Sequence, residues 1–352
     1  MDLDNLEAYA PIDPSGMGNW IDNLAQQCME ARQIAEAVAL PTFGEIRGVV
    51  ILGMGGSAIG GDLVRIALEG EAKVPFIVNR DYELPGFVGP DTLVIASSYS
   101  GNTEETLAGY TEARKRGAML LVIATGGTLV EWARRDGVTV IQIPGGISPR
   151  AALGYSFVPL LVTAWRLGLC ADKSTQLDAT IGLLEKLRST YGREVPTEQN
   201  RPKQLAQMLY GRIPLFYGSA GYRSVVATRI KGQINENAKQ IAFWNVFPEL
   251  NHNELVGWEA PGLTRQIMLF VLRDRGESER IHTRIEVTED IIRERVAGIE
   301  DLWAEGDSQL EKMFSLIYLG DYISYYLAML NGIDPTPVKV IDRLKGELAK
   351  IG

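Results

Sequence analysis

Short apolar runs alternate with longer amphipathic stretches along the first half of the chain. The runs are five or six residues long and mostly apolar, which predicts strands, and the stretches between them have helical spacing. A strand that is apolar on both faces is typical of a parallel sheet covered by helices on both sides. The expected strands are 48–52, 74–78, 92–96, 119–124 and 138–143, and the expected helices between them are 57–69, 103–116 and 127–135.

The alternation returns more loosely after 190–202, a polar segment with two prolines that we expect to separate two domains. A strand expected at 212–217 is followed by Gly218-Ser-Ala-Gly221 and a helix to about residue 239. This order echoes residues 49–58 and the helix after them, so two related α/β halves are predicted. The remaining expected elements are a strand at 266–272 and helices at 19–38, 149–168, 174–192, 277–294, 307–331 and 336–350.

Composition narrows the class of protein. The chain has 352 residues, of which 46% are hydrophobic and 22% charged, as in a soluble globular enzyme. A net charge of −9 argues against a nucleic-acid surface. Cys28 and Cys170 lie far apart and indicate neither a disulfide framework nor a zinc site. The acidic start is unlike a signal peptide, and no apolar run approaches about 20 residues, so a cytoplasmic setting is expected.

The segment 97–106 reads Ser-Ser-Tyr-Ser-Gly-Asn-Thr-Glu-Glu-Thr and connects a buried strand to a helix. Ser98, Ser100 and Thr103 can each donate a hydrogen bond, and the backbone N–H groups of the first helical turn point the same way. The segment contains no lysine. Neutral donors and a helix dipole suit a phosphate monoester on a small molecule.

A glycine-rich loop, 53–61, follows the first strand and opens the first helix. Gly53, Gly55 and Ala58 fit the GxGxxG/A fingerprint, and Asp81 follows the second strand, so an NAD-dependent dehydrogenase of the Rossmann type is one alternative. That alternative leaves the hydroxyl-rich segment without a role. Two anion loops on neighbouring parallel strands fit one sugar phosphate better. The simplest alternative is that both loops are tight helix entries.

These two loops, GMGGSAIGGDL and SSYSGNTEET, resemble the sugar isomerase (SIS) fold. Three further stretches resemble the narrower family of bifunctional phosphoglucose/phosphomannose isomerases, and the resemblance covers about residues 45–350. They are Ser148-Pro-Arg-Ala-Ala-Leu-Gly154, Asn235-Glu-Asn-Ala-Lys239 with Pro248-Glu-Leu-Asn-His-Asn-Glu254, and Ile341-Asp-Arg-Leu-Lys345.

The resemblance implies an α/β protein with two SIS-type domains, each a mainly parallel sheet flanked by helices. Four parts are then expected. Residues 1–45 form an N-terminal helical segment that packs on the core, and 46–192 form the first SIS domain with the phosphate loops. Residues 203–335 form the second SIS domain with the catalytic Glu and His, and 336–352 form a C-terminal helix with the catalytic Lys.

The family interconverts glucose 6-phosphate and fructose 6-phosphate, and also mannose 6-phosphate, by ring opening and proton transfer through a cis-enediolate. By resemblance Glu236 is the base that moves the proton between C1 and C2, since a carboxylate suits that task. His252 and Lys345 open the ring, and Arg150 stabilises the enediolate. By the same resemblance Glu105 helps orient the sugar. The residues expected to bind the phosphate are Gly55, Gly56, Ser57, Ser98, Ser100 and Thr103.

Each assignment has a simpler alternative on sequence alone. Glu236 could equally be a solvated glutamate on a helix face. Arg150 could equally be a surface arginine. The chain has two histidines, of which His282 lies in a charged helical run and is expected to be an exposed bystander. Lys339 and Lys350 share the expected C-terminal helix with Lys345.

The resemblance also carries expectations about specificity and assembly. In relatives with both activities a threonine shortly before the C-terminal lysine gives room for epimerisation at C2, and an ungapped count places Val338 there, with Thr336 two residues earlier. Relatives receive the histidine from the partner subunit, so a homodimer is expected. Aldose–ketose proton transfer requires no metal or nucleotide cofactor. The rival in another class is a non-catalytic sugar-phosphate-binding SIS regulator.

Overall fold

The computed structural model describes residues 1–260, 262–348 and 350. The chain divides into two compact units, which we name after their sheets. The first-sheet unit comprises Asp22–Lys186 and Glu305–Ser315, and the second-sheet unit comprises Met1–Ile21, Leu187–Ala304 and Leu316–Gly352. The division falls within two helices, α8 (Ser174–Tyr191) and α13 (Gln309–Asn331). The four-part organisation expected from the sequence stays a prediction.

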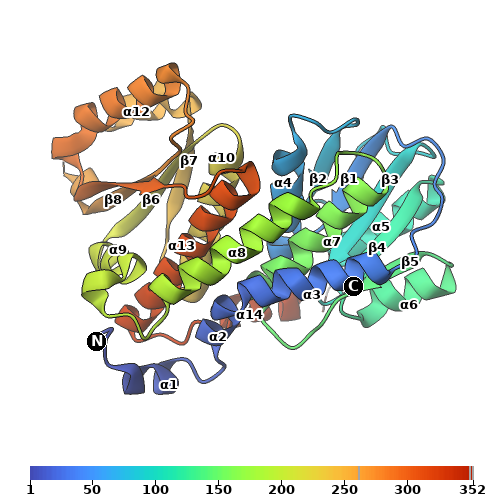
Figure 1. Cartoon of the computed structure of the whole chain (residues 1–352), viewed down its shortest axis with the longest axis horizontal. Coiled ribbons are helices and arrows are strands. Elements are labelled where there is room, and N and C mark those ends of the chain that lie inside the picture. The colour runs from blue at the N-terminus through green and yellow to red at the C-terminus, as the bar shows by residue number, and fades with distance from the viewer. Residues whose placement is uncertain (261, 349, 351–352) are drawn as a thin grey trace. The chain divides into compact units, whose positions relative to one another are not determined.

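The first-sheet unit contains five parallel strands in the order β2-β1-β3-β4-β5 (Figure 1). Their side chains are buried on both faces at the centre of the sheet, as the continuous apolar runs predict. The strands are β1 (Gly48–Leu52), β2 (Phe76–Asn79), β3 (Thr92–Ser98), β4 (Met119–Ala124) and β5 (Thr139–Gln142).

Helices cover both faces of this sheet because successive strand residues point to opposite sides. Val50 and Leu52 share one core with side chains of α5 (Glu104–Lys115) and α6 (Gly127–Arg135). On the other face, Gly61 of α4 (Gly55–Leu68) lies against Ile51 and Val78. α7 (Leu153–Arg166) packs on α4 and on α3 (Leu24–Ala37).

The second-sheet unit contains four parallel strands in the order β7-β6-β8-β9, so it repeats the first four positions of the first sheet. On one face, Leu215 and Leu269 share a core with Ile285 and Ile292 of α12 (Glu279–Ile292). Strand β6 also contacts α10 (Tyr222–Asn237), whose packing with α13 is close enough to require Gly320. The strands are β6 (Ile213–Ser219), β7 (Phe243–Phe247), β8 (Ile267–Arg273) and β9 (Gly298–Trp303). The remaining α-helices are α1 (Tyr9–Ile12), α2 (Met17–Asp22), α9 (Arg201–Leu209), α11 (Glu254–Gly257) and α14 (Lys339–Leu348). The predicted fold class, two parallel-sheet α/β domains with flanking helices, is confirmed.

Several elements differ from the sequence expectation. The nine-residue helix α9 was not predicted, because its start lies in the polar, proline-containing segment 190–202 expected to separate two domains. The single helix expected at 19–38 is broken at Asn23, which leaves the helical conformation and separates α2 from α3. Strands β7 and β9 were not predicted. Both lie at the edges of their sheet, and polar residues interrupt their apolar runs: β7 contains Asn245, and β9 contains Glu300 and Asp301.

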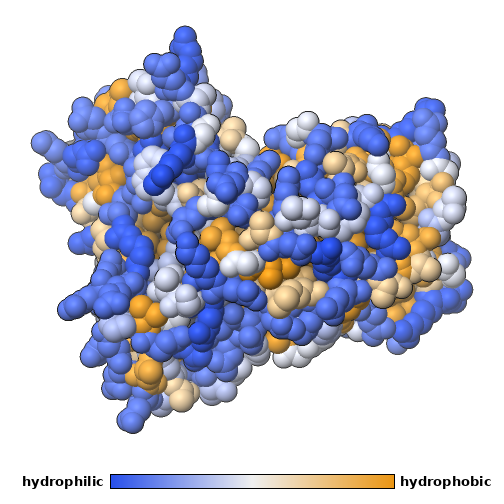
Figure 2. Space-filling view, viewed as in Figure 1, coloured by the Kyte–Doolittle hydropathy of each residue, from blue (hydrophilic) through white to orange (hydrophobic). Residues whose placement is uncertain are grey.

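Helix α13 has the length and composition of a membrane-spanning helix. Polar residues interrupt its apolar residues, so the sequence contains no long continuous apolar run there. Of its most apolar 18-residue window, 94% is buried inside the molecule, so α13 is a core helix. On the face drawn in Figure 2 the surface is mainly hydrophilic, with apolar patches between the polar side chains.

Candidate functional site

The strand order of the first sheet reverses between β1 and β3, and ligands of open parallel sheets bind outside the carboxyl ends of strands at such a point. The loops that follow these two strands meet there. A β-carbon on Gly53 would lie 3.0 Å from the Ser97 carbonyl oxygen, and the Ser57 hydroxyl accepts a hydrogen bond from the Tyr99 N–H at 3.1 Å. The two loops singled out in the sequence therefore form one edge. We call it the first crevice.

Hydroxyl groups line the β3 side of the first crevice. The Ser98 Oγ lies 2.9 Å from the Thr103 Oγ1 and accepts from the Gly101 N–H at 3.1 Å, and the Ser100 Oγ accepts from Asn102 at 3.2 Å. Thr103 holds the N-cap position of α5, yet its side chain makes no capping hydrogen bond. The first turn of α5 therefore keeps its backbone donors for an anion.

Two glycines allow this edge to close. Gly101 has a φ of +70°, and a β-carbon there would lie 1.8 Å from the Gly126 carbonyl oxygen. A β-carbon on Gly56 would lie 2.7 Å from the Pro149 carbonyl oxygen, so only glycine lets the first turn of α4 approach the 3₁₀ turn Pro149–Ala151. Gly55 opens α4 with a φ of +51°.

Arg150 lies in that 3₁₀ turn and is 5% exposed. Its guanidinium donates to the Ser148 hydroxyl at 2.8 Å. The Tyr99 hydroxyl, from the β3 loop, accepts from the Ile147 N–H at 3.3 Å and so connects the segment before Arg150 to the phosphate loop. Arg150 is thus a buried cation beside the first crevice and not a surface arginine.

Glu105 is half-buried in the first turn of α5, next to Glu104, which accepts from the Tyr82 hydroxyl at 3.2 Å. A carboxylate at the start of a helix is stabilised by the dipole and repels a second anion. Its place fits contact with the neutral part of a ligand.

Glu236 lies in the last turn of α10, in the second-sheet unit, and is half-buried. The asparagines on either side anchor this helix end: Asn235 accepts from the Ala242 N–H at 3.0 Å, and Asn237 donates to Ser324 at 2.9 Å. Glu236 lines a pocket of about 860 Å³ within that unit. The other lining residues are Lys231, Gly232, Asn235, Lys239, Gln240, Ile241, Ile333, Asp334, Pro337, Val338, Lys339, Val340 and Ile341.

His252 and Lys345 do not belong to the described lining of this pocket. His252 ends the 3₁₀ turn Glu249–His252 and is exposed, and Lys345 is exposed on α14. Lys339, an alternative that the sequence left open, does line the pocket. Val338 also lines it, whereas Thr336 lies outside the described lining. The catalytic and binding roles expected of all these residues stay predictions.

The second sheet has the same reversal, between β6 and β8, and we call its carboxyl edge the second crevice. Its side chains bind one another. Arg223 donates to the Ser219 hydroxyl at 2.5 Å, and Asp274 accepts from the Tyr222 hydroxyl at 2.7 Å and lies 3.5 Å from Arg223. The charges here are already paired within the chain.

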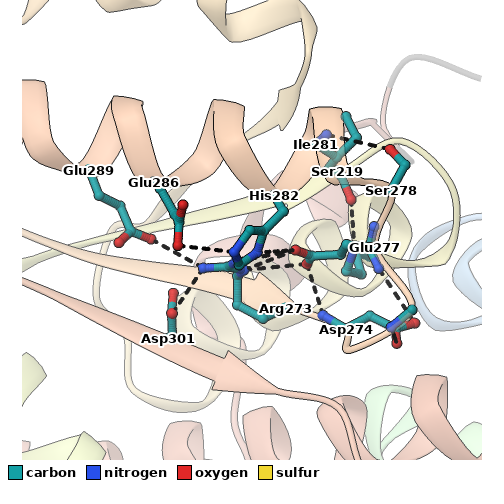
Figure 3. Close-up of polar contacts among 12 residues, drawn as sticks. Ser219, Arg273, Asp274, Glu277, Ser278, Ile281, His282, Glu286, Glu289 and Asp301 are labelled. Atoms are coloured by element: carbon teal, nitrogen blue, oxygen red, sulfur yellow. Dashed lines mark hydrogen bonds and ion pairs between the residues drawn. The ribbon is translucent and has the colours of Figure 1, made fainter.

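Beside the second crevice, Arg273 carries a buried cluster that the sequence analysis missed (Figure 3). Its guanidinium lies 3.0 Å from Asp301, 3.2 Å from Glu277 and 3.8 Å from Glu289. His282, expected to be a bystander, has its Nδ1 2.8 Å from Arg273 and its Nε2 3.0 Å from Glu286. The signal available in the sequence was Arg273-Asp-Arg275, the charged run that follows the strand expected at 266–272.

Burial, with the neighbouring Asp301 carboxylate as the second cause, raises the pKa of Glu289 to about 7. In the part of the chain that the structure describes, Glu289 Oε1 and Asp301 Oδ1 are buried without a hydrogen-bond partner. Burial beside the Asp301 carboxylate therefore favours the protonated form of Glu289.

The strand order also tests the dinucleotide alternative. A Rossmann sheet has the order 3-2-1-4-5-6, whereas the first sheet here begins 2-1-3-4-5. Asp81 is exposed in a turn after β2, where it accepts from the Tyr82 N–H at 2.7 Å. The GxGxxA match therefore lies in a different α/β topology.

Comparison with known proteins agrees with this topology. Residues 45–167 match the SIS domain family, and residues 198–348 match the bacterial phospho-glucose isomerase C-terminal SIS domain. A hypothetical protein from Thermus thermophilus has a similar fold, with a TM-score of 0.73 at 20% identity over 96% of this chain and 91% of that one.

Two sequence relatives are named bifunctional phosphoglucose/phosphomannose isomerase. The protein from Caldicellulosiruptor bescii is 50% identical over 94% of this chain and 98% of its own length. The protein from Aquifex aeolicus is 38% identical over 86% of this chain and 91% of its own length. The chain therefore belongs to the family of bifunctional phosphoglucose/phosphomannose isomerases, as its motifs predicted.

Proposed function

We propose that this protein interconverts glucose 6-phosphate, fructose 6-phosphate and mannose 6-phosphate. The observation that carries the proposal is the first crevice, where uncharged hydroxyls and the start of α5 meet beside the buried Arg150 at a topological switch point. An open, neutral anion site with one adjacent cation suits a phosphorylated sugar. The reaction is inferred from the relatives, which are named bifunctional phosphoglucose/phosphomannose isomerase.

In this proposal the phosphate binds to the loop groups and not to a lysine. Ser100, Thr103 and the first turns of α4 and α5 supply hydrogen bonds, while Ser57 and Ser98 hold the two loops in place through the Tyr99 and Gly101 N–H groups. Arg150, with its guanidinium held by Ser148, balances the negative charge that develops on the C1 and C2 oxygens.

The second-sheet unit supplies the proton chemistry. Glu236 takes the proton from one of the two carbons and returns it to the other, and its half-buried place at a helix end favours a defined orientation. Ring opening is assigned to His252, whose imidazole can both accept and donate a proton, and to a lysine of α14. Lys345 is the family's candidate, and Lys339 is the alternative because it lines the pocket of Glu236.

We propose further that the active form is a homodimer with His252 contributed across the interface. Two observations support this. His252 is exposed and does not line the pocket of Glu236 in its own chain. Near it, a groove of about 590 Å³ next to the edge strand β7 is lined by exposed apolar side chains, among them Phe243, Trp244 and Leu263.

A cytoplasmic setting is part of the proposal. Cys28 and Cys170 are buried free thiols, and burial raises the pKa of Cys28 to about 12. Such thiols suit a reducing compartment.

The test is turnover of fructose 6-phosphate by the purified protein, with glucose 6-phosphate and mannose 6-phosphate measured separately. Both products should form. Glu236→Gln should lower kcat by about 10³-fold while fructose 6-phosphate still binds, because the amide cannot accept the proton. Binding without turnover by the unmodified protein would indicate a sugar-phosphate-binding regulator, and glucose 6-phosphate alone would remove the mannose activity.

The same variant tests the dimer. Glu236→Gln and His252→Asn are each expected to be nearly inactive. Dissociated and reassembled together, they should recover up to about a quarter of the original activity, because a mixed dimer contains one intact site. Mixtures as inactive as the separate variants would place His252 and Glu236 of the same chain in one site.

A further inference from the structure

Lys239 has a backbone conformation that lysine rarely adopts. Its φ is +52°, and it is the one non-glycine residue with positive φ in the described part of the chain. It lies two residues beyond the end of α10, where helices often place glycine in the left-handed region. A β-carbon is strained there, and such strain persists where the surrounding structure requires that residue. The contacts of the Lys239 side chain therefore account for a lysine at this position.

The Lys239 ammonium connects two segments of the second-sheet unit. It donates to the carbonyl oxygen of Glu236, in the last turn of α10, and to that of Pro335 at 2.9 Å. Glu236 is the proposed base. Pro335 begins the segment that contains Val338 and leads into α14.

Both ends of this connection reach the same pocket. Lys239, Glu236 and Val338 all line it. The left-handed conformation turns the chain at the end of α10, and the long side chain then reaches both carbonyl groups. Glycine would permit the turn but could not make the connection.

A neighbouring contact supports the rest of this region independently. The amide of Asn331, at the end of α13, donates to the Ala238 carbonyl oxygen and to the Gln240 side chain, both at 3.1 Å. The ends of α10 and α13 thus remain joined without the lysine. Loss of the Lys239 ammonium should therefore release the segment after Pro335 and leave the fold intact.

We propose that Lys239 is a positioning residue for the isomerisation, which fixes Val338 and the start of α14 relative to Glu236. This inference rests on the proposed function. Because the ammonium is engaged by two carbonyl groups, it acts through these neighbours and not on the sugar. Val338, or Thr336 two residues earlier, takes the place of the family's threonine that gives room at C2, and both lie in the segment after Pro335. Lys239 should therefore influence which face of the enediolate receives the proton.

The test compares Lys239→Gly with Lys239→Met. Glycine relieves the backbone strain and removes the ammonium, and methionine removes the ammonium alone. Each should lower kcat for fructose 6-phosphate about tenfold or more, leave KM within about threefold, and change the ratio of mannose to glucose product by at least about threefold. The melting temperature of Lys239→Gly should exceed that of Lys239→Met, because both lose the ammonium and only glycine favours positive φ. Lys239→Arg should restore part of kcat.

The control is Lys231→Met, which removes another ammonium from the rim of the same pocket. A comparable loss of kcat in that variant would attribute the effect to the charge of the pocket and overturn the inference. An unchanged kcat and product ratio in Lys239→Gly would overturn it as well.

Amide hydrogen exchange separates this inference from the proposed function. Exchange at Ile341 and Asp342, whose N–H groups donate to the Val338 carbonyl oxygen, should accelerate about tenfold in Lys239→Gly, whether or not the protein turns over sugar phosphates. If the unmodified protein has no isomerase activity, the proposed function fails and exchange alone decides the connection. If exchange does not change, the connection does not hold the segment.

Discussion

The two sheets share a strand order but use their switch points in opposite ways. In the first crevice the loops after β1 and β3 present hydroxyls and helix starts, and Arg150 is the cation beside them. In the second crevice, after β6 and β8, Arg223 and Asp274 pair with each other, and Arg273 lies among three carboxylates.

The difference shows what a topological switch point needs to become a binding site. Parallel sheets bring loops and helix starts together in both places. A ligand can bind only where the donors have not been used by the chain's own carboxylates. In the second crevice the Asp274 carboxylate takes the hydrogen bond of the Tyr222 hydroxyl. The switch point of the first sheet is therefore suited to binding, and that of the second sheet to structure.

The strongest test of the comparison makes the first crevice resemble the second. Ser100→Asp places a carboxylate among the hydroxyls, where it would repel a phosphate dianion. The KM for fructose 6-phosphate should rise about 100-fold, which corresponds to about 2.7 kcal/mol. Ser100 is exposed, so the fold should tolerate the change. Ser100→Asn, of similar size but neutral, is the control, and a KM within about threefold for the aspartate variant would move the phosphate to another site.

The second test breaks the pairing in the second crevice. Asp274→Asn keeps an acceptor for the Tyr222 hydroxyl but leaves the buried Arg223 without its counter-charge. The free energy of unfolding should fall by about 2 kcal/mol, with kcat/KM of the folded enzyme unchanged. Urea denaturation measures the first quantity.

Asp178→Asn provides the matched control, because it breaks an exposed pair with Arg32 and should cost less than about 1 kcal/mol. A fall in kcat/KM with unchanged stability in Asp274→Asn would assign the second crevice a role in turnover.

The smallest expected effect concerns pH. Glu289 has a pKa of about 7 in the folded protein and 4.5 as its ordinary value, so folding takes up a proton between these limits. The stabilisation is fully present below pH 4.5 and is lost as the pH rises through 7, by about 1 kcal/mol after allowance for solvent screening. Glu289→Gln stays neutral and should remove this slope from urea denaturation measured at several pH values.

The exposed Asp290→Asn, on the same helix, should keep the slope. If unmodified protein and Glu289→Gln showed the same pH dependence, the raised pKa of Glu289 would be ruled out.

Local sequence was sufficient for the elements of the first half. Continuous apolar runs predicted the five strands of the first sheet, and the glycine and hydroxyl motifs predicted two loops, which meet at one edge of that sheet. The pattern failed at the edge strands β7 and β9, because polar residues interrupt their apolar runs. It also gave no indication that Asn23 interrupts a helix.

The sequence by itself determined the parallel α/β architecture and the family, because both depend on local patterns: apolar period, glycine where loops approach closely, and short motifs. Only the tertiary structure decided how side chains distant in sequence are paired. In the tertiary structure Arg150 is buried beside the first crevice, and Arg223 pairs with Asp274 in the second crevice. The Lys239 side chain donates to the Pro335 carbonyl oxygen, 96 residues away along the chain. Such pairings depend on distances between segments that no local pattern encodes.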